Sequence, residues 1–138
     1  EDKNIYTFSI HCMDNFPALK QPSDLDVPLM SGVGDEEYLR QSSDGLTRAL
    51  IASRPELIIY LAGADPFEDD RLGRLALTKR GLQRRDTLVF DECRRNFIPV
   101  AIAMGGGYAN RIQDIVDIHA TTIRCAESLY LNGSRRLA

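Results

Sequence analysis

The sequence lacks the features of a nucleic-acid-binding, membrane-spanning or disulfide-bonded protein. Its formal net charge is −3 and its pI is near 5.4, so no basic field favours direct contact with nucleic acid. No apolar run approaches the roughly 18 residues that span a bilayer, and the N-terminal residues show no signal-peptide pattern. The three cysteines, Cys12, Cys93 and Cys125, suit neither a disulfide framework nor a paired-cysteine metal site. We therefore expect a protein of the reducing cytoplasm that contacts neither nucleic acid nor membrane.

The chain also lacks internal repeats, low-complexity segments and linkers. Its 138 residues, 43% hydrophobic and 27% charged, suffice for one globular domain with a core. It begins at Glu1 without an initiator methionine and enters a predicted strand almost at once. We therefore expect the chain to begin inside a larger unit.

Strand-like and helix-like segments alternate along the sequence. Residues rich in β-branched and apolar side chains predict strands, and apolar residues at helical spacing predict helices. We expect strands at 5–10, 25–30, 57–62 and 98–104, and helices at 35–53, 79–96 and 109–130. This alternation is typical of βαβ units with right-handed crossovers. It predicts an α/β fold with three layers, α/β/α, around a mostly parallel sheet.

Several residues predict where these elements end and what they bury. Pro28 lacks a ladder donor and belongs at a sheet edge or a strand end. Arg54–Pro55 ends the first helix, and Thr78 is the expected N-cap of the second. Asn132–Gly133 is expected to end the last helix. The positions expected to face the core are Leu39, Ser42, Leu46, Ala49, Leu50 and Ser53 in the first helix, Leu82, Val89 and Cys93 in the second, and Ile112, Ile115, Val116, His119 and Ile123 in the third.

Polar or glycine-rich chemistry follows three of the strands. These ends are residues 9–11, 63–65 and 105–108, and parallel strands bring their carboxyl ends to one edge, where ligands collect. Asp65 and Tyr108 together suggest metal-assisted hydrolysis, with a phenol stabilising the oxyanion. Taken singly, an aspartate there is more often a cap or turn, and a glycine triplet is more often a turn. His119 is best interpreted as a core histidine with its hydrogen bonds satisfied.

A phosphate-binding turn is a competing interpretation of residues 105–107. The dinucleotide fingerprint would also require glycine at position 110, which is Asn110, and no Gly-Lys-Ser/Thr is present. A Rossmann-like nucleotide-binding domain is therefore disfavoured.

The order and spacing of several motifs resemble the C-terminal half of zinc-dependent histone deacetylases, in the arginase/deacetylase superfamily. That family includes acetylpolyamine amidohydrolases and acetoin-utilisation proteins, and the sequence is most similar to its class IV branch and bacterial relatives. The motifs that carry the resemblance are Leu61-Ala62-Gly63-Ala64-Asp65, Asp69-Asp70-Arg71-Leu72-Gly73, Leu77-Thr78, Gly81, Arg85-Asp86, Val89-Phe90, Pro99 and Gly105-Gly106-Gly107-Tyr108.

The resemblance implies site roles for seven residues. Asp65 matches the second aspartate of the family's Asp, His, Asp zinc site, and Tyr108 matches the tyrosine that hydrogen-bonds the substrate carbonyl and oxyanion. The remaining matches are Gly106, Gly107 and Phe16 at the substrate channel, and Ser9 with the Ile10 carbonyl at a structural potassium site. The implied reaction is hydrolysis of acyl-lysine or acetylpolyamine amides by metal-activated water.

The family's other zinc ligands, an Asp-x-His pair, and its tandem His-His have no counterpart here. The two histidines, His11 and His119, stand in neither motif, whereas a catalytic zinc takes three protein ligands. We therefore expect residues 1–138 to be the C-terminal part of a single deacetylase domain whose N-terminal half is absent. Such a chain alone should be inactive and should need the N-terminal half, a second copy of itself, or both. The alternative is a non-catalytic, deacetylase-like binding or assembly module.

Overall fold

The computed structural model describes residues 2–131. Its elements are β1 (Phe8–Cys12), β2 (Leu25–Leu29), α1 (Asp35–Ser53), β3 (Ile58–Gly63), α2 (Lys79–Arg95), β4 (Val100–Gly105) and α3 (Ile112–Leu131). Their types and order confirm the α/β prediction, and the bounds of α1 are the predicted ones. The predicted end of the last helix at Asn132–Gly133 lies outside the described residues.

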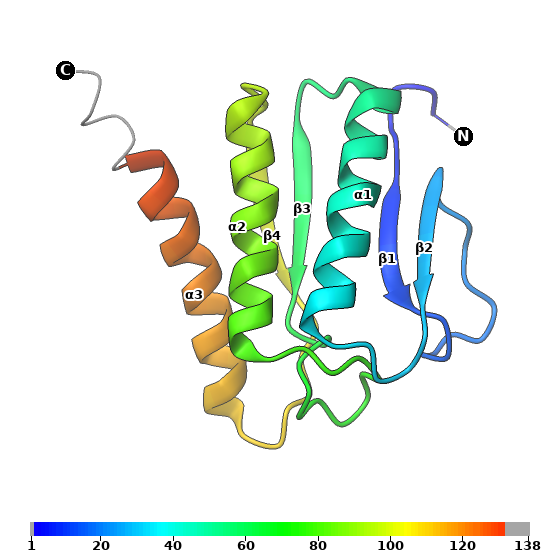
Figure 1. The fold of residues 1–138 in the computed structure, drawn as a ribbon, viewed down its shortest axis with the longest axis vertical. Coiled ribbons are helices and arrows are strands. Elements are labelled where there is room, and N and C mark those ends of the chain that lie inside the picture. Colours follow the sequence, from blue (N-terminus) through cyan, green and yellow to red (C-terminus); the bar gives the residue numbers. More distant parts are fainter. Residues whose placement is uncertain (1, 132–138) are drawn as a thin grey trace.

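The strands pair in parallel, as predicted. β1 pairs with β2 from Phe8↔Leu25 to Cys12↔Leu29, and β3 pairs with β4 from Ile58↔Val100 to Gly63↔Gly105. The strands point in the same direction, so their carboxyl ends lie at one edge (Figure 1). Within residues 2–131, however, they form two two-stranded sheets and no continuous sheet. Pro28 is the last but one residue of β2, which pairs only with β1 within the described residues, as expected for a proline at a strand end or an edge.

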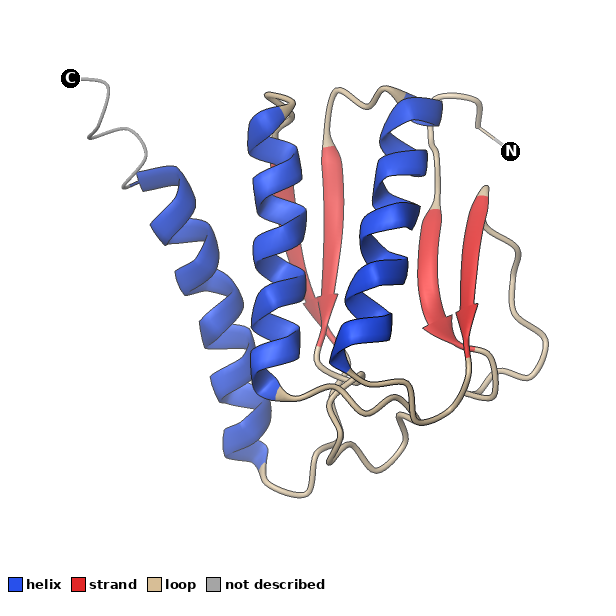
Figure 2. Ribbon diagram, viewed as in Figure 1, coloured by secondary structure: helices blue, strands red, loops and turns tan. Residues whose placement is uncertain are grey.

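Helix α1 connects the two sheets by packing. Leu46 and Leu50 of α1 share an apolar cluster with Phe8 of β1 and with Ile58 and Tyr60 of β3. The helices α1 and α2 lie on the same side of the strands (Figure 2). The opposite side of β3 is exposed, with Ile59 at 74% and Leu61 at 69%. The described residues therefore supply one helical layer of the three-layer arrangement.

The helix ends follow from local chemistry. Arg54 adopts a left-handed conformation at φ 46° and donates its backbone N–H to the carbonyl of Leu50, which ends α1 before Pro55. Thr78 Oγ1 accepts from the backbone N–H of Gly81 at 3.0 Å, which confirms the predicted N-cap of α2. No helix within residues 2–131 is long and apolar enough to cross a membrane.

The predicted core faces of α1 and α2 are largely confirmed, whereas that of α3 is confirmed only at Ile115, which packs against the core. The buried residues of α3 are Ile118, Thr122 and Cys125, whereas Ile112, Val116 and Ile123 are 73%, 51% and 49% exposed. Helix α3 packs chiefly on α2. Since α2 presents the polar Asp86 to it, the residue that faces the core is Thr122, which donates to that carboxylate.

The interpretation of His119 as a satisfied core histidine is also wrong. Its side chain is half-buried in the structure. The Nδ1 atom is buried and has no hydrogen-bond partner among the described residues. Buried polar nitrogen atoms normally have a partner, so this side of α3 has an unmet hydrogen-bonding group beside its exposed apolar stripe.

Candidate functional site

A pocket of about 390 Å³ lies where β1 and β3 end. Its lining includes Ser9, His11, Phe16, Lys20 and Asp65. These residues come from two segments more than forty positions apart in the sequence, and the parallel strands bring them to the same edge of the fold (Figure 1). The pocket is the place at which α/β folds commonly bind ligands.

The Asp65 carboxylate lies against backbone. A Cβ atom at either Gly63 or Gly106 would lie 2.5 Å from its Oδ1 atom, so a side chain at either position would displace this carboxylate. Burial raises the pKa of Asp65 above its ordinary value, and the nearby charge of Asp70 also raises it, whereas the Arg85 guanidinium lowers it. A desolvated carboxylate at a strand end is suited to pair with a cation.

The last two glycines of the triplet adopt a backbone conformation that other residues rarely adopt. Gly106 has φ +65° and Gly107 has φ +111°. A Cβ atom at Gly107 would approach the Cβ of Ala64 to 3.2 Å. The backbone after β4 therefore passes directly over the residues that follow β3, which brings the third predicted strand end into the site.

Tyr108 does not line the pocket in the described part of the chain. Its side chain is 54% exposed. Its backbone is fixed: the N–H donates to Oδ2 of Asp70 at 2.6 Å, and the carbonyl accepts from the backbone N–H of Arg71 at 3.2 Å and from Nε of Arg71 at 3.0 Å. Tyr108 is thus anchored to the loop that follows Asp65.

Asp70 organises this loop, a role that the sequence analysis did not assign. Its Oδ1 atom accepts from the backbone N–H groups of Leu72 and Gly73 at 2.9 and 2.7 Å, while Oδ2 accepts from Tyr108. The spacing Asp-x-x-Gly is a signal for such a turn. One carboxylate therefore connects the segment after β3 to the segment after β4.

Phe16 projects from the loop after β1 and is 96% exposed. The same loop is held from inside by Lys20, whose Nζ atom donates to the carbonyls of Met13, Asn15 and Pro17 at 3.1, 2.7 and 3.0 Å. The ammonium thus occupies a ring of carbonyls at the base of the aromatic side chain. This role of Lys20 was not predicted from the sequence.

The two residues predicted to hold potassium lie in β1. The side chain of Ser9 lines the pocket and its Oγ atom is 2.8 Å from Nδ1 of His11. Ile10 packs against the core. The cation site at Ser9 and the Ile10 carbonyl remains a prediction.

The donor set of the pocket fits one metal ligand and no complete zinc site. Asp65 is exposed in the described part of the chain and supplies one carboxylate, whose pKa is raised chiefly by desolvation. Within residues 2–131, no group of three or more histidine, cysteine, aspartate or glutamate side chains is arranged to hold a metal ion. A zinc ion at this position would therefore need ligands from outside the described part of the chain.

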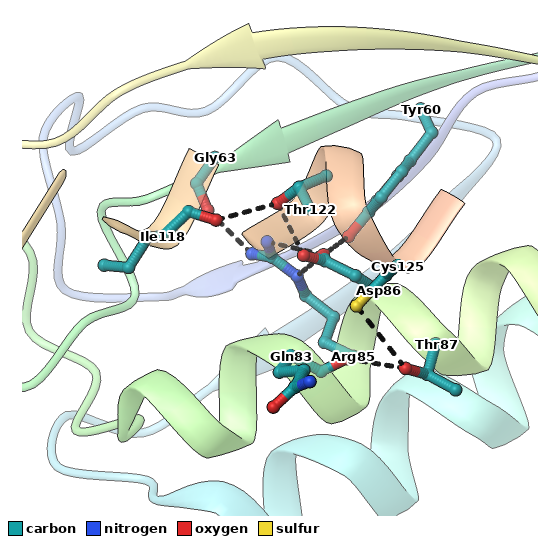
Figure 3. Close-up of polar contacts among 9 residues, drawn as sticks. All are labelled: Tyr60, Gly63, Gln83, Arg85, Asp86, Thr87, Ile118, Thr122 and Cys125. Carbon is teal, nitrogen blue, oxygen red and sulfur yellow. Dashed lines mark hydrogen bonds and ion pairs between the residues drawn. The ribbon is translucent and has the colours of Figure 1, made fainter. Parts of the chain in front are cut away.

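A buried charged cluster lies behind the pocket. Arg85 and Asp86 of α2 are 5% and 1% exposed, and Arg85 Nη1 donates to the carbonyl of Gly63 at 2.7 Å (Figure 3). In the sequence, Arg85-Asp86 stands out only as part of a family motif. An Arg-Asp pair on a helix is usually a surface feature, so no local signal indicated its burial.

Comparison with known proteins agrees with this geometry. Residues 1–123 match the sequence profile of the histone deacetylase domain. An uncharacterized protein of Picosynechococcus sp. is 44% identical over 130 residues, which cover 94% of this chain and 43% of the relative. Histone deacetylase 2 of Arabidopsis thaliana is 33% identical over 111 residues, which cover 78% of this chain and 29% of that protein. The chain thus spans less than half the length of these relatives.

Two solved structures share the fold. The acetylpolyamine aminohydrolase from Burkholderia pseudomallei superposes with a TM-score of 0.76 at 20% identity, over 92% of this chain and 39% of that chain. The HDA15 HD domain superposes with a TM-score of 0.70 at 22% identity, over 91% of this chain and 39% of that chain. The parallel strand pairs therefore form part of an arginase/deacetylase-like architecture. With a profile match over most of its length, this chain belongs to the histone deacetylase domain family.

Proposed function

We propose that this chain is the C-terminal part of a zinc-dependent deacetylase that hydrolyses acyl-lysine or acetylpolyamine amides. The observation that carries the proposal is the placement of Asp65, which lines a pocket at the strand ends with Phe16 and whose carboxylate touches Gly106. Membership of the histone deacetylase family supports the reaction class. We place the enzyme in the cytoplasm.

Each site residue of the chain has a separate role in this proposal. Asp65 is one metal ligand, and zinc, when bound, supplies a Lewis acid that polarises the amide carbonyl and activates water. The phenol of Tyr108 swings toward the carbonyl and donates a hydrogen bond to the developing oxyanion. Gly106 and Gly107 let the acyl chain run close to backbone, and the ring of Phe16 forms one wall of its channel. Ser9 and the Ile10 carbonyl hold potassium.

The exposed apolar surface supports a partner of defined origin. Ile59 and Leu61 on β3 and Met104 on β4 are 74%, 69% and 63% exposed, and the relatives are more than twice as long as the matched segment. We propose that the N-terminal half of the same domain covers this surface and supplies the missing zinc ligands and the base for the attacking water. A second copy of this chain is the alternative cover.

The strand pairing supports the same partner. Within the described residues, β1 pairs only with β2 and β3 only with β4, although α1 packs on β1 and β3 together. A strand contributed by the N-terminal half between β1 and β3 would join the two pairs into one sheet. It would also satisfy backbone groups that are otherwise unpaired at two sheet edges.

The full-length protein provides the test. Tyr108→Phe should lower the single-turnover rate of deacetylation of an acetyl-lysine peptide and of an acetylated polyamine by about 10²–10³-fold, the usual effect of losing one oxyanion donor. Tyr6→Phe, a substitution outside the site, is the matched control. A Tyr108→Phe rate equal to that of the wild type would rule out Tyr108 as the oxyanion donor.

The non-catalytic module is the second candidate, because residues 2–131 contain no three-ligand group. The two candidates differ in the metal content of the full-length protein. The enzyme should bind one zinc per chain and lose it on Asp65→Asn, while residues 1–138 alone should bind zinc weakly and show no turnover. Full-length protein without zinc and without turnover would favour the module.

A further inference from the structure

Three buried polar side chains, Arg85, Asp86 and Thr122, and the partly buried Tyr60 connect β3, α2 and α3 behind the pocket. Asp86 lies at the centre: its Oδ1 accepts from Tyr60 Oη at 2.6 Å and from Arg85 Nη2 and Nε at 2.8 and 3.0 Å, and its Oδ2 accepts from Thr122 Oγ1 at 2.6 Å. Figure 3 shows these groups converging from the three elements. Every charged group of the cluster therefore has a partner.

The Arg85 guanidinium makes one further hydrogen bond, to the strand end that carries Asp65. Its Nη1 atom donates to the carbonyl oxygen of Gly63 at 2.7 Å. Gly63 is the last residue of β3 and lies two positions before Asp65. The guanidinium also lies 5.8 Å from the ring centroid of Tyr60 in β3, and this cation–π contact limits its movement on the side that faces the strand.

The bond from Arg85 acts on a peptide group that is held at both ends. The carbonyl of the Gly63–Ala64 peptide accepts from Arg85, and the N–H of the same peptide donates to the carbonyl of Gly105 at 3.0 Å. Because a peptide group is planar and rigid, these two bonds fix its orientation. The direction in which the chain leaves β3 toward Asp65 follows from that orientation.

We propose that Arg85 is a positioning residue for the Asp65 carboxylate. Through the Gly63–Ala64 peptide it fixes the strand end from which Asp65 projects into the pocket, and Asp86 with Tyr60 and Thr122 holds the guanidinium in place. The inference rests on the proposed role of Asp65 as a metal ligand. Arg85 itself touches neither substrate nor metal.

Zinc affinity distinguishes this role from a purely structural one. Loss of a residue that orients a metal ligand typically weakens metal binding about 10–100-fold, whereas a structural residue affects unfolding alone. The measurement is the zinc dissociation constant of the full-length protein, determined by competition with a chromophoric chelator, together with thermal unfolding of each variant.

Two single variants and a matched control form the first experiment. Arg85→Lys keeps the positive charge but cannot contact Asp86 and Gly63 in the same planar fork, and Arg85→Gln removes the charge. Both should weaken zinc binding at least tenfold. Arg84→Gln alters the neighbouring arginine, which is exposed and pairs with Glu36, and should leave the zinc affinity within twofold.

A triple variant addresses the possibility that the single Arg85 variants fail to fold because Asp86 is left unpaired. Tyr60→Phe, Arg85→Met and Asp86→Leu together remove both charges and the phenol that depends on them, so no buried charge is left alone. The protein should fold and still bind zinc at least tenfold more weakly. Wild-type zinc affinity in the folded triple variant would overturn the positioning role.

The Asp65→Asn variant separates the two proposals. If Asp65→Asn weakens zinc binding and the folded Arg85 variants do not, only the positioning role fails. If Asp65→Asn itself leaves zinc binding unchanged, the proposed metal ligand is wrong and the role of Arg85 falls with it.

Discussion

Gly106 lies so close to the carboxylate of Asp65 that a Cβ atom added at position 106 would be only 2.5 Å from Oδ1. These residues follow two different strands, β4 and β3, which pair in register up to Gly63↔Gly105. The contact therefore depends on the last pair of the ladder. A side chain at position 106 would displace the carboxylate, and the backbone there has φ +65°, which non-glycine residues rarely adopt.

Gly106→Ala should damage the site more than the fold. An alanine in the left-handed conformation costs about 1–2 kcal/mol of stability. In addition, its Cβ atom would clash with the Asp65 carboxylate and displace it. Zinc binding by the full-length protein should weaken at least tenfold, as measured by chelator competition.

Gly32→Ala is the control for that variant. Gly32 also has a positive φ, +79°, but a Cβ atom there would meet nothing within 4 Å. Gly32→Ala should therefore cost similar stability in urea and leave zinc binding unchanged. Equal zinc affinities for the two variants would contradict the assigned contact between Gly106 and Asp65.

Tyr60→Phe should reduce the loss of stability that accompanies a rise to alkaline pH. Burial raises the pKa of Tyr60 well above its ordinary value, and the Asp86 charge adds to this effect against the opposing charge of Arg85. The unfolded state thus releases its proton near pH 10 while the folded state retains it, so stability falls as pH rises above that point, by up to about 1.4 kcal/mol per pH unit for one group.

The measurement is the free energy of unfolding in urea at pH 9, 10 and 11. The wild type should lose stability across this range and Tyr60→Phe should lose less. Tyr108→Phe, at an exposed tyrosine, serves as the control and should keep the wild-type slope. A slope for Tyr60→Phe as steep as that of the wild type would rule out this contribution.

Leu61→Lys should destabilise the full-length protein strongly, because we propose that its N-terminal half covers Leu61. Burying an unpaired ammonium there should cost at least ~2 kcal/mol. Ile51→Lys is the matched control: Ile51 is 72% exposed on α1, compared with 69% for Leu61 on β3, and should remain solvated. Urea unfolding of both variants measures the difference, and equal stabilities would contradict the proposed cover.

Lys20→Met should loosen the loop that carries Phe16. Hydrogen bonds to a charged group are worth about 1.5–3 kcal/mol each, so amide exchange at Met13 and Asn15 should accelerate about tenfold or more. These amides donate to the carbonyls of Leu29 and Cys12. Lys3→Met, at an exposed position, should leave their exchange unchanged; equal exchange in both variants would mean that the carbonyl ring does not hold the loop.

The sequence predicted the parts of this molecule that local patterns determine. The apolar run before Asp65 is β3, Thr78 caps α2, and Arg54–Pro55 ends α1. Apolar spacing alone did not determine which side of α3 is buried, because Thr122 faces the core only through Asp86. Asp70 and Arg85 act on peptide groups 38 and 22 positions away in the sequence, and such pairings follow from tertiary packing.

The cluster around Asp86 also constrains how this sequence can change over time. A buried charge that loses its partner is strongly destabilising, whereas replacing all members by apolar groups is often tolerated. Tyr60, Arg85, Asp86 and Thr122 should therefore be inherited as a set, and homologues that lack one should lack the others. In an alignment of full-length relatives, the four columns should covary across three separate elements of the fold.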